Sequence, residues 1–157
     1  MKTDIGISDK NRQAVAKTLN AVLADEYVLY TKTRKFHWNV TGPHFNDLHK
    51  FFEAQYEELD GIVDEVAERV RSLGHVSSGT LSEFSKQSRL KEKPGQNPEA
   101  KGMLQELLSD HEAVIRTLRT DVEACANDYA DAGTSDFLTG IMEQHEKMAW
   151  MLRSATS

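Results

Sequence analysis

One stretch, residues 49–68, limits most strongly what this chain can fold into. It carries apolar residues at helical spacing and two pairs of potential metal ligands, His49 with Glu53 and Asp64 with Glu68, each four residues apart. Residues i and i+4 lie on one face of an α-helix, and at about 100° per residue all four fall within roughly 100° of arc. The stretch is therefore predicted to be one amphipathic helix with imidazole and carboxylate groups along one flank of its apolar stripe.

The length of that helix sets a condition on any metal site. His49 and Asp64 are fifteen residues apart, which at ~1.5 Å per residue is roughly 22 Å along the axis. One metal ion cannot reach both pairs within a single chain. If the four side chains act together, a second copy of the helix must run antiparallel beside the first, and a two-fold symmetric dimer supplies that arrangement.

Composition limits the class of protein that could carry such a helix. The chain has 157 residues, 39% hydrophobic and 28% charged, which is ordinary for a soluble globular protein. We expect one domain over residues 1–157 with a short tail at 1–8. No apolar run approaches ~20 residues and the N-terminus lacks an apolar signal-peptide core, so no membrane partner and a cytoplasmic location are expected. The single cysteine, Cys125, is expected in the core or at an interface.

Helical patterns occupy the rest of the first half of the chain. A first helix is expected from about residue 9 to 37, because Ser8 offers an N-cap and apolar residues follow at helical spacing. Gly42 and Pro43 then break the chain, since proline disfavours helical geometry in the residue before it. The second helix starts near residue 45 and is expected to end at Gly74.

The second half repeats the pattern after a long polar connection. Residues 75–97 form this connection and should hold a short helix at 81–88. Asn97 as a cap and Pro98 as the first helical residue predict the start of the third helix. A break at 127–135 separates it from the fourth. These elements predict an all-α, ferritin-like four-helix bundle with a short helix between its second and third long helices.

The usual metal site of a ferritin-like bundle is not expected inside this chain. That site needs Glu-x-x-His motifs on two helices, with all ligands pointing into one bundle. No histidine of the chain has a glutamate three residues before it. His111 and His145 fall on apolar stripes of the third and fourth helices, where core packing is expected. The candidate ligands must therefore be placed elsewhere.

Several short motifs occur at specific spacing. HWNV occupies positions 37–40, LH follows at 48–49, and DEVAER at 64–69. In the last helix HEK at 145–147 leads into WM at 150–151. Together these motifs resemble the signature of the Dps mini-ferritins, the DNA-binding proteins from starved cells, and the resemblance covers nearly the whole chain.

The resemblance implies a hollow shell of twelve identical subunits. Such a shell oxidises Fe²⁺, preferably with hydrogen peroxide, stores the ferric mineral and protects DNA from oxidative damage. It implies a di-iron ferroxidase centre at each two-fold interface, in agreement with the helix-length argument. His37, His49 and Glu53 would come from one subunit and Asp64 and Glu68 from its neighbour, with no catalytic residues beyond these ligands. Glu53 departs from the commoner Asp and adds one methylene of reach.

Each of these residues also has a simpler interpretation. Acids four residues apart on a helix commonly form a solvated face, where they contribute little. A lone histidine such as His37 is more often a packed core or interface residue, and only the joint pattern with the other candidates favours a ligand. Trp38, next to the site, is expected to pack at the dimer interface, with a role as an electron donor secondary.

Three acids lie around the expected start of the fourth helix: Asp128, Asp131 and Asp136. One interpretation is an N-cap and a polar loop, in which Asp136 interacts with the helix dipole. In the resembling family this region lines acidic three-fold pores that admit Fe²⁺. The three residues are therefore candidates for such a pore, where three copies would add their negative potentials.

DNA is left open as a partner. The net charge of −6 disfavours nonspecific attraction to nucleic acid and suits cation uptake. A basic cluster in the connection, Lys86, Arg89, Lys91 and Lys93, could contact phosphate if repeated twelvefold, although a solvated loop is the simpler interpretation. The main alternative function is thus a nucleoid-compacting, DNA-binding shell with little iron chemistry. A third is a purely structural helical dimer.

Overall fold

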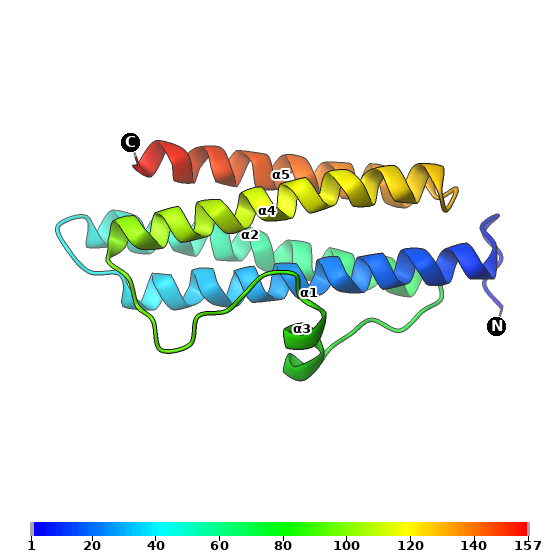
Figure 1. Cartoon of the computed structure of the whole chain (residues 1–157), viewed down its shortest axis with the longest axis horizontal. Coiled ribbons are helices and arrows are strands. Elements are labelled where there is room, and N and C mark those ends of the chain that lie inside the picture. Colours follow the sequence, from blue (N-terminus) through cyan, green and yellow to red (C-terminus); the bar gives the residue numbers. More distant parts are fainter. Residues whose placement is uncertain (1, 157) are drawn as a thin grey trace.

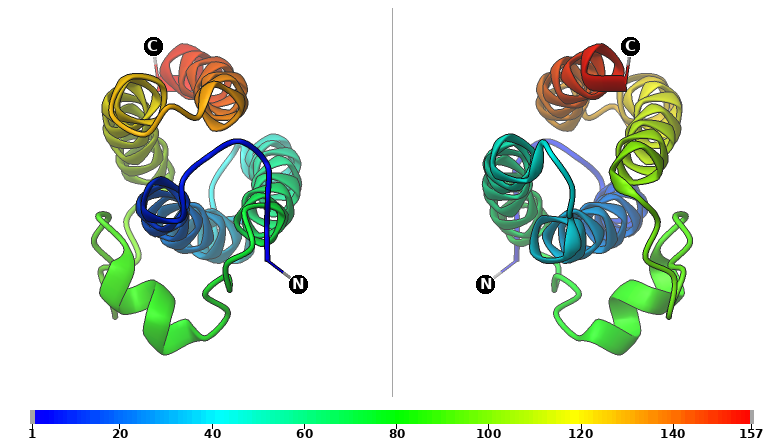
Figure 2. Two further views of the ribbon diagram at one scale, coloured as in Figure 1. Left: turned by 90° about the vertical axis from the view of Figure 1, so that its right-hand side faces the viewer. Right: turned by 90° about the vertical axis from the view of Figure 1, so that its left-hand side faces the viewer.

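Five α-helices make up the part of the chain that the computed structural model describes, residues 2–156 (Figure 1). They are α1 (Asp9–Asn39), α2 (Phe45–Ser72), α3 (Leu81–Gln87), α4 (Ala100–Asn127) and α5 (Ala132–Thr156). The helices α1 and α2 form one hairpin and α4 and α5 form another, while α3 lies outside the bundle against α1 (Figures 1 and 2). The predicted all-α, four-helix bundle with a short extra helix is confirmed. Within the described residues, none of the helices is long and apolar enough to cross a membrane.

Local signals place several helix ends where they were predicted. Ser8 Oγ accepts a hydrogen bond from the Asn11 backbone N–H at 3.2 Å and caps α1. After α2, Gly74 has a φ of +84°, the left-handed conformation that commonly ends a helix. Thr80 and Glu83 form a reciprocal capping box at the start of α3. These ends depend on contacts within a few residues, which is why sequence patterns indicate them.

The start of α4 differs from the prediction. The helix begins at Ala100, and Glu99 rather than Asn97 is its N-cap residue. Pro98 is not the first helical residue but lies over Gly102 in the first turn, so close that a β-carbon at Gly102 would be 2.9 Å from Pro98 Cβ. The proline therefore packs against the outside of the first turn instead of starting it.

The start of α5 also differs, because the predicted break at 127–135 is too long. The helix begins at Ala132, since Asp131 is already a capping residue. Asp131 Oδ1 accepts from the Thr134 backbone N–H at 2.9 Å, and Oδ2 accepts from the Thr134 hydroxyl at 2.6 Å. The short polar stretch that looked like a loop is thus the first turn of α5.

The apolar stripes of the four long helices meet in one core. Its largest fully buried side chains include Phe36, Phe52, Leu59 and Leu107. Cys125 is fully buried, as expected. Burial raises the pKa of the Cys125 thiol to about 12, and nearby carboxylates add to the shift. The thiol therefore stays protonated at neutral pH and acts as a small apolar residue.

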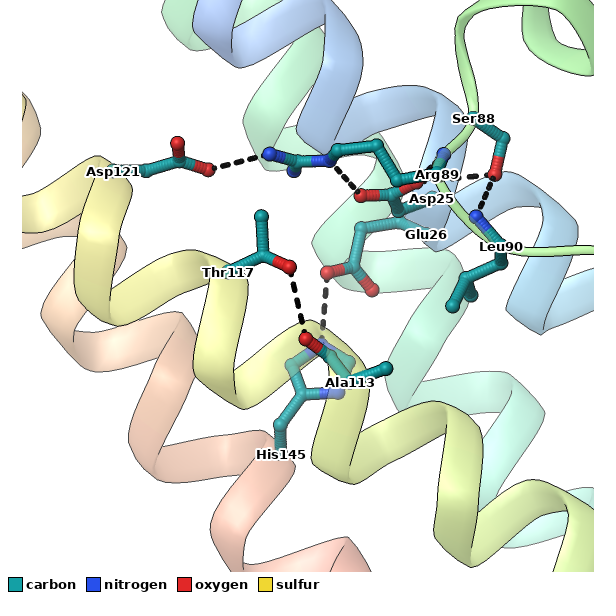
Figure 3. A network of polar contacts seen from close by, with 9 residues as sticks. All are labelled: Asp25, Glu26, Ser88, Arg89, Leu90, Ala113, Thr117, Asp121 and His145. Carbon is teal, nitrogen blue, oxygen red and sulfur yellow. Dashed lines mark hydrogen bonds and ion pairs between the residues drawn. The ribbon is translucent and has the colours of Figure 1, made fainter.

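The polar connection between α2 and α4 is anchored to the bundle. Arg89 Nε donates to Asp25 Oδ2 of α1 at 2.7 Å, and Arg89 Nη1 donates to Asp121 Oδ2 of α4 at 3.1 Å (Figure 3). The Ser88 hydroxyl and the Arg89 backbone N–H both donate to Asp25 Oδ1. Asp25 is only 2% exposed. The interpretation of this segment as a freely solvated loop is therefore wrong at Arg89.

Replacing Arg89 should destabilise the protein. We expect Arg89→Met to lower the free energy of unfolding by about 1–3 kcal/mol, because the nearly buried Asp25 carboxylate loses its charged partner while Arg89 itself is partly exposed. The matched control is Arg119→Met, which removes an exposed ion pair with Glu146 and should cost less than about 0.5 kcal/mol. Urea denaturation measures both variants. Equal losses would contradict the anchoring role of Arg89.

Candidate metal centre

Two histidines face each other where α1 ends and α2 begins. The rings of His37 and His49 stack with their centroids 3.7 Å apart and their planes inclined by 16°. His37 Nδ1 lies 2.7 Å from the His49 carbonyl oxygen, and His49 Nδ1 lies 2.8 Å from the His37 carbonyl oxygen. A carbonyl oxygen only accepts, so both Nδ1 atoms carry a proton and donate it. With Nδ1 committed in this way, Nε2 is the ring atom whose lone pair can bind a metal, as imidazole does in its neutral form.

A short turn between α1 and α2 brings these rings together. The Val40 backbone N–H donates to the Phe36 carbonyl and closes α1, and Val40 is buried. Gly42 has a φ of +113°, which favours glycine, and its carbonyl accepts from the Phe45 N–H at 3.1 Å. The chain thus reverses within a few residues. Phe45 also lies against the His49 ring, with centroids 5.1 Å apart.

Aromatic rings and one arginine border the histidine pair. The rings of Tyr56 and His37 lie nearly perpendicular, with centroids 5.2 Å apart and planes inclined by 78°. Arg34 lies over Tyr56 at 4.9 Å and over Trp38 at 5.5 Å. Burial raises the pKa of Tyr56, and the negative charge of Glu53 raises it further. Trp38 is 64% exposed, so its ring is accessible to a partner molecule beside the site.

The carboxylates divide between the two ends of α2. Glu53 is half-buried one turn after His49, whereas Asp64 and Glu68 are exposed near the other end. Within residues 2–156, no three His, Cys, Asp or Glu side chains are grouped closely enough to hold a metal ion. The structure thus brings the two histidines together but leaves Asp64 and Glu68 apart from them. A metal centre built from all of these residues needs donors from a second chain.

The three acids proposed for a pore have different environments. Asp131 is 2% exposed, caps α5 through Thr134 and pairs with Arg69 Nη2 at 3.4 Å. Asp128 and Asp136 are exposed, at the end of α4 and in the second turn of α5. Asp136 is therefore not the capping residue of α5, a position that Asp131 takes. Of the three acids, Asp128 and Asp136 are therefore the two that are exposed to solvent.

Part of the basic cluster is neutralised by neighbouring acids. Arg89 is paired with two carboxylates, as described above, and Lys93 Nζ lies 3.2 Å from Glu106 Oε2. Lys86 and Lys91 remain exposed. Only part of the positive charge in this connection is therefore available to a phosphate backbone.

The sequence patterns did not identify Glu26 as a buried polar residue of the core. Glu26 is fully buried and lies 2.8 Å from His145 Nε2, so His145 is more than the core packing residue that was expected. The sequence does contain a signal for the burial of Glu26, because this residue falls between Val22 and Leu29 on the apolar stripe of α1. A carboxylate at such a position needs a buried partner.

Known proteins share this fold and much of this sequence. The sequence profile of the Ferritin-like domain matches residues 16–157. An uncharacterized low temperature-induced protein of Nostoc sp. is 48% identical over 153 residues, which cover 98% of this chain and 86% of that protein. DNA protection during starvation protein 2 of Bacillus anthracis is 38% identical over 144 residues, covering 92% and 97%. Among solved structures, Dps from Vibrio cholerae has a TM-score of 0.92 at 30% identity, covering 100% of this chain and 98% of that chain.

The helical bundle and these similarities define a ferritin-like protein. Within that class, the chain belongs to the Dps family. The family membership indicated by the motifs is thus confirmed. The Vibrio protein is described as a member of a broad superfamily of ferritin-like diiron-carboxylate proteins. The individual ligands of this chain stay predictions.

Removal of one Nε2 atom should weaken metal binding without loosening the hairpin. In His49→Asn, the side-chain amide can still donate to the His37 carbonyl but no Nε2 remains. We expect its affinity for Co²⁺ to fall about tenfold or more, as is typical when a ligand set is disturbed. His44→Asn, at an exposed histidine, is the control and should bind Co²⁺ normally. Anaerobic calorimetry measures both, and unchanged binding by His49→Asn would exclude this histidine as a ligand.

Proposed function

We propose that this chain is a ferroxidase subunit that oxidises Fe²⁺ with hydrogen peroxide. Twelve subunits form a shell in the cytoplasm, which stores the ferric product. The shell thereby protects DNA from oxidative damage. The observation that carries the proposal is the pair of hydrogen bonds that commit Nδ1 of His37 and His49 and leave Nε2 for a metal, with Glu53 one turn after His49. The described residues of one chain do not complete a metal site alone. Membership of the Dps family supports it, since relatives are named for DNA protection during starvation.

The proposed centre is shared between two chains. His37, His49 and Glu53 come from one subunit, and Asp64 and Glu68 come from its neighbour. The two groups lie roughly 22 Å apart along α2 at ~1.5 Å per residue. An antiparallel second copy of α2 brings each histidine group against the partner's acidic group, and two-fold symmetry creates two equal sites.

Iron is the substrate of this site, and the donor set fits it. Imidazole and carboxylate bind ferrous iron without the thiolates that favour zinc or iron–sulfur clusters, and carboxylates also accept the harder ferric ion. Five side chains for two irons leave coordination positions open for peroxide. Two Fe²⁺ each give one electron, and H₂O₂ with two protons becomes two water molecules. A paired two-electron reduction avoids the release of hydroxyl radical.

Iron entry is proposed at the turn between α4 and α5. Asp128 and Asp136 are exposed there and would add negative potential around a three-fold pore. Asp131, which caps α5, would hold the turn that presents them. A DNA-compacting shell has less support in this chain, because Arg89 and Lys93 of the basic cluster are paired with acids.

Mixing two inactive variants tests the shared site. His49→Ala and Asp64→Ala should each lose peroxide-dependent Fe²⁺ oxidation. In a mixed dimer one interface site carries both defects and the other carries neither, so random reassembly should restore about a quarter of the wild-type activity. The control mixture, His49→Ala with Glu53→Ala, should stay inactive, because both defects lie in the same half of the site.

Two results would contradict the proposal. Mixed dimers of His49→Ala and Asp64→Ala that form but remain inactive would exclude a site shared in this way. Full activity in either single variant would exclude that residue as an essential ligand. Mass spectrometry of the reassembled protein shows whether mixed dimers are present.

A further inference from the structure

A buried polar network joins the two helical hairpins. His145 of α5 places Nε2 at 2.8 Å from Glu26 Oε1 of α1, and its Nδ1 at 2.9 Å from His111 Nδ1 of α4. All three side chains are fully buried. Figure 3 shows Glu26 and His145 meeting across the bundle, whereas the preceding residue, Asp25, points away toward Arg89.

The contact between two Nδ1 atoms limits how many protons the network can hold. A hydrogen bond needs one donor and one acceptor, so only one of these Nδ1 atoms carries a proton. His145 Nε2 lies within hydrogen-bond distance of a Glu26 carboxyl oxygen and donates to it when the carboxylate is ionised. The two rings therefore hold at most one positive charge while the contact persists. A second charge would place two N–H groups head to head at the observed distance of 2.9 Å.

Two buried atoms of the network have no partner among the described residues that would stabilise an additional proton. Glu26 Oε2 and His111 Nε2 are buried without a hydrogen-bond partner in the described part of the chain. Burial lowers the pKa of His111 well below its ordinary value, and the charge of His145 lowers it further. From α2 the buried polar residue is Gln55, which does not titrate and donates to the Met148 carbonyl at 3.3 Å.

The neighbouring charged groups are engaged elsewhere. Asp110, adjacent to His111 on α4, forms an ion pair with Lys32 of α1 at 2.6 Å. Glu112, on the other side of His111, pairs with Arg153 at the surface. Among the described residues, the ionisable groups that contact the two histidines are therefore each other and Glu26.

We propose that the Glu26–His145–His111 network is an acid-sensitive clasp, which holds α1 against the α4–α5 hairpin and opens when mild acid adds a proton beyond the one that the two facing Nδ1 atoms can share. The inference concerns the bundle itself and does not depend on the iron chemistry proposed above. In the closed state His111 excludes the proton, whereas a hydrated histidine in the open state takes it up with a pKa of about 6.5. Opening is therefore suppressed above that pH and favoured below it.

Hydrogen exchange of the metal-free, full-length protein measures this opening. The amide exchange rates of α4 and α5, divided by the intrinsic rates, give an opening constant at each pH. For one proton taken up, the wild-type constant should rise about tenfold between pH 6 and pH 5. His111→Asn keeps a hydrogen-bonding atom near the position of Nδ1 but cannot be protonated, so its constant should rise about threefold or less.

The exposed histidine at position 44 provides the matched control. His44→Asn removes an imidazole outside the network and should keep the full pH dependence of the wild type. Equal pH dependence of the wild type and His111→Asn would overturn the proposal. If His111→Asn does not fold, exchange of the histidine ring C–H groups in the wild type replaces it. A His111 ring that titrates near pH 6.5 while the helices stay protected would also overturn the clasp.

Discussion

The reciprocal hydrogen bonds between His37 and His49 are the constraint on which the proposed chemistry depends. Each ring is oriented by the backbone carbonyl of the other residue, so the tautomer of one ligand depends on the position of the other. These bonds join the end of α1 to the start of α2. The hairpin must therefore be folded before both Nε2 atoms are oriented together, and the buried core of the bundle keeps it folded.

The two hairpins carry different parts of the proposed function. All five proposed ligands lie on α1 and α2, whereas Asp128 and Asp136 lie around the turn between α4 and α5. The buried contact between Glu26 and His145 links these halves through the core. The stability of that contact thus affects whether the hairpin with the proposed ligands and the hairpin with the proposed pore residues keep one relative position.

Local patterns in the sequence predicted most of the fold, because helix periodicity and caps such as Ser8 depend on nearby residues. The start of α5 was predicted less well, since the capping role of Asp131 could not be distinguished from that of other acids nearby. The anchoring of Arg89 by Asp25 and the pairing of Glu26 with His145 join residues far apart in the chain. Such pairings depend on how helices pack, which a single periodic pattern does not contain.

The most direct test of the account is the position of iron in crystals of the assembled protein soaked anaerobically with Fe²⁺. Diffraction data collected on both sides of the iron absorption edge locate the metal without reference to any expected ligand. We expect anomalous peaks at two-fold interfaces, between His49 and Glu53 of one chain and the carboxylates at positions 64 and 68 of the next. Iron bound inside a single bundle, with these side chains free of metal, would contradict it.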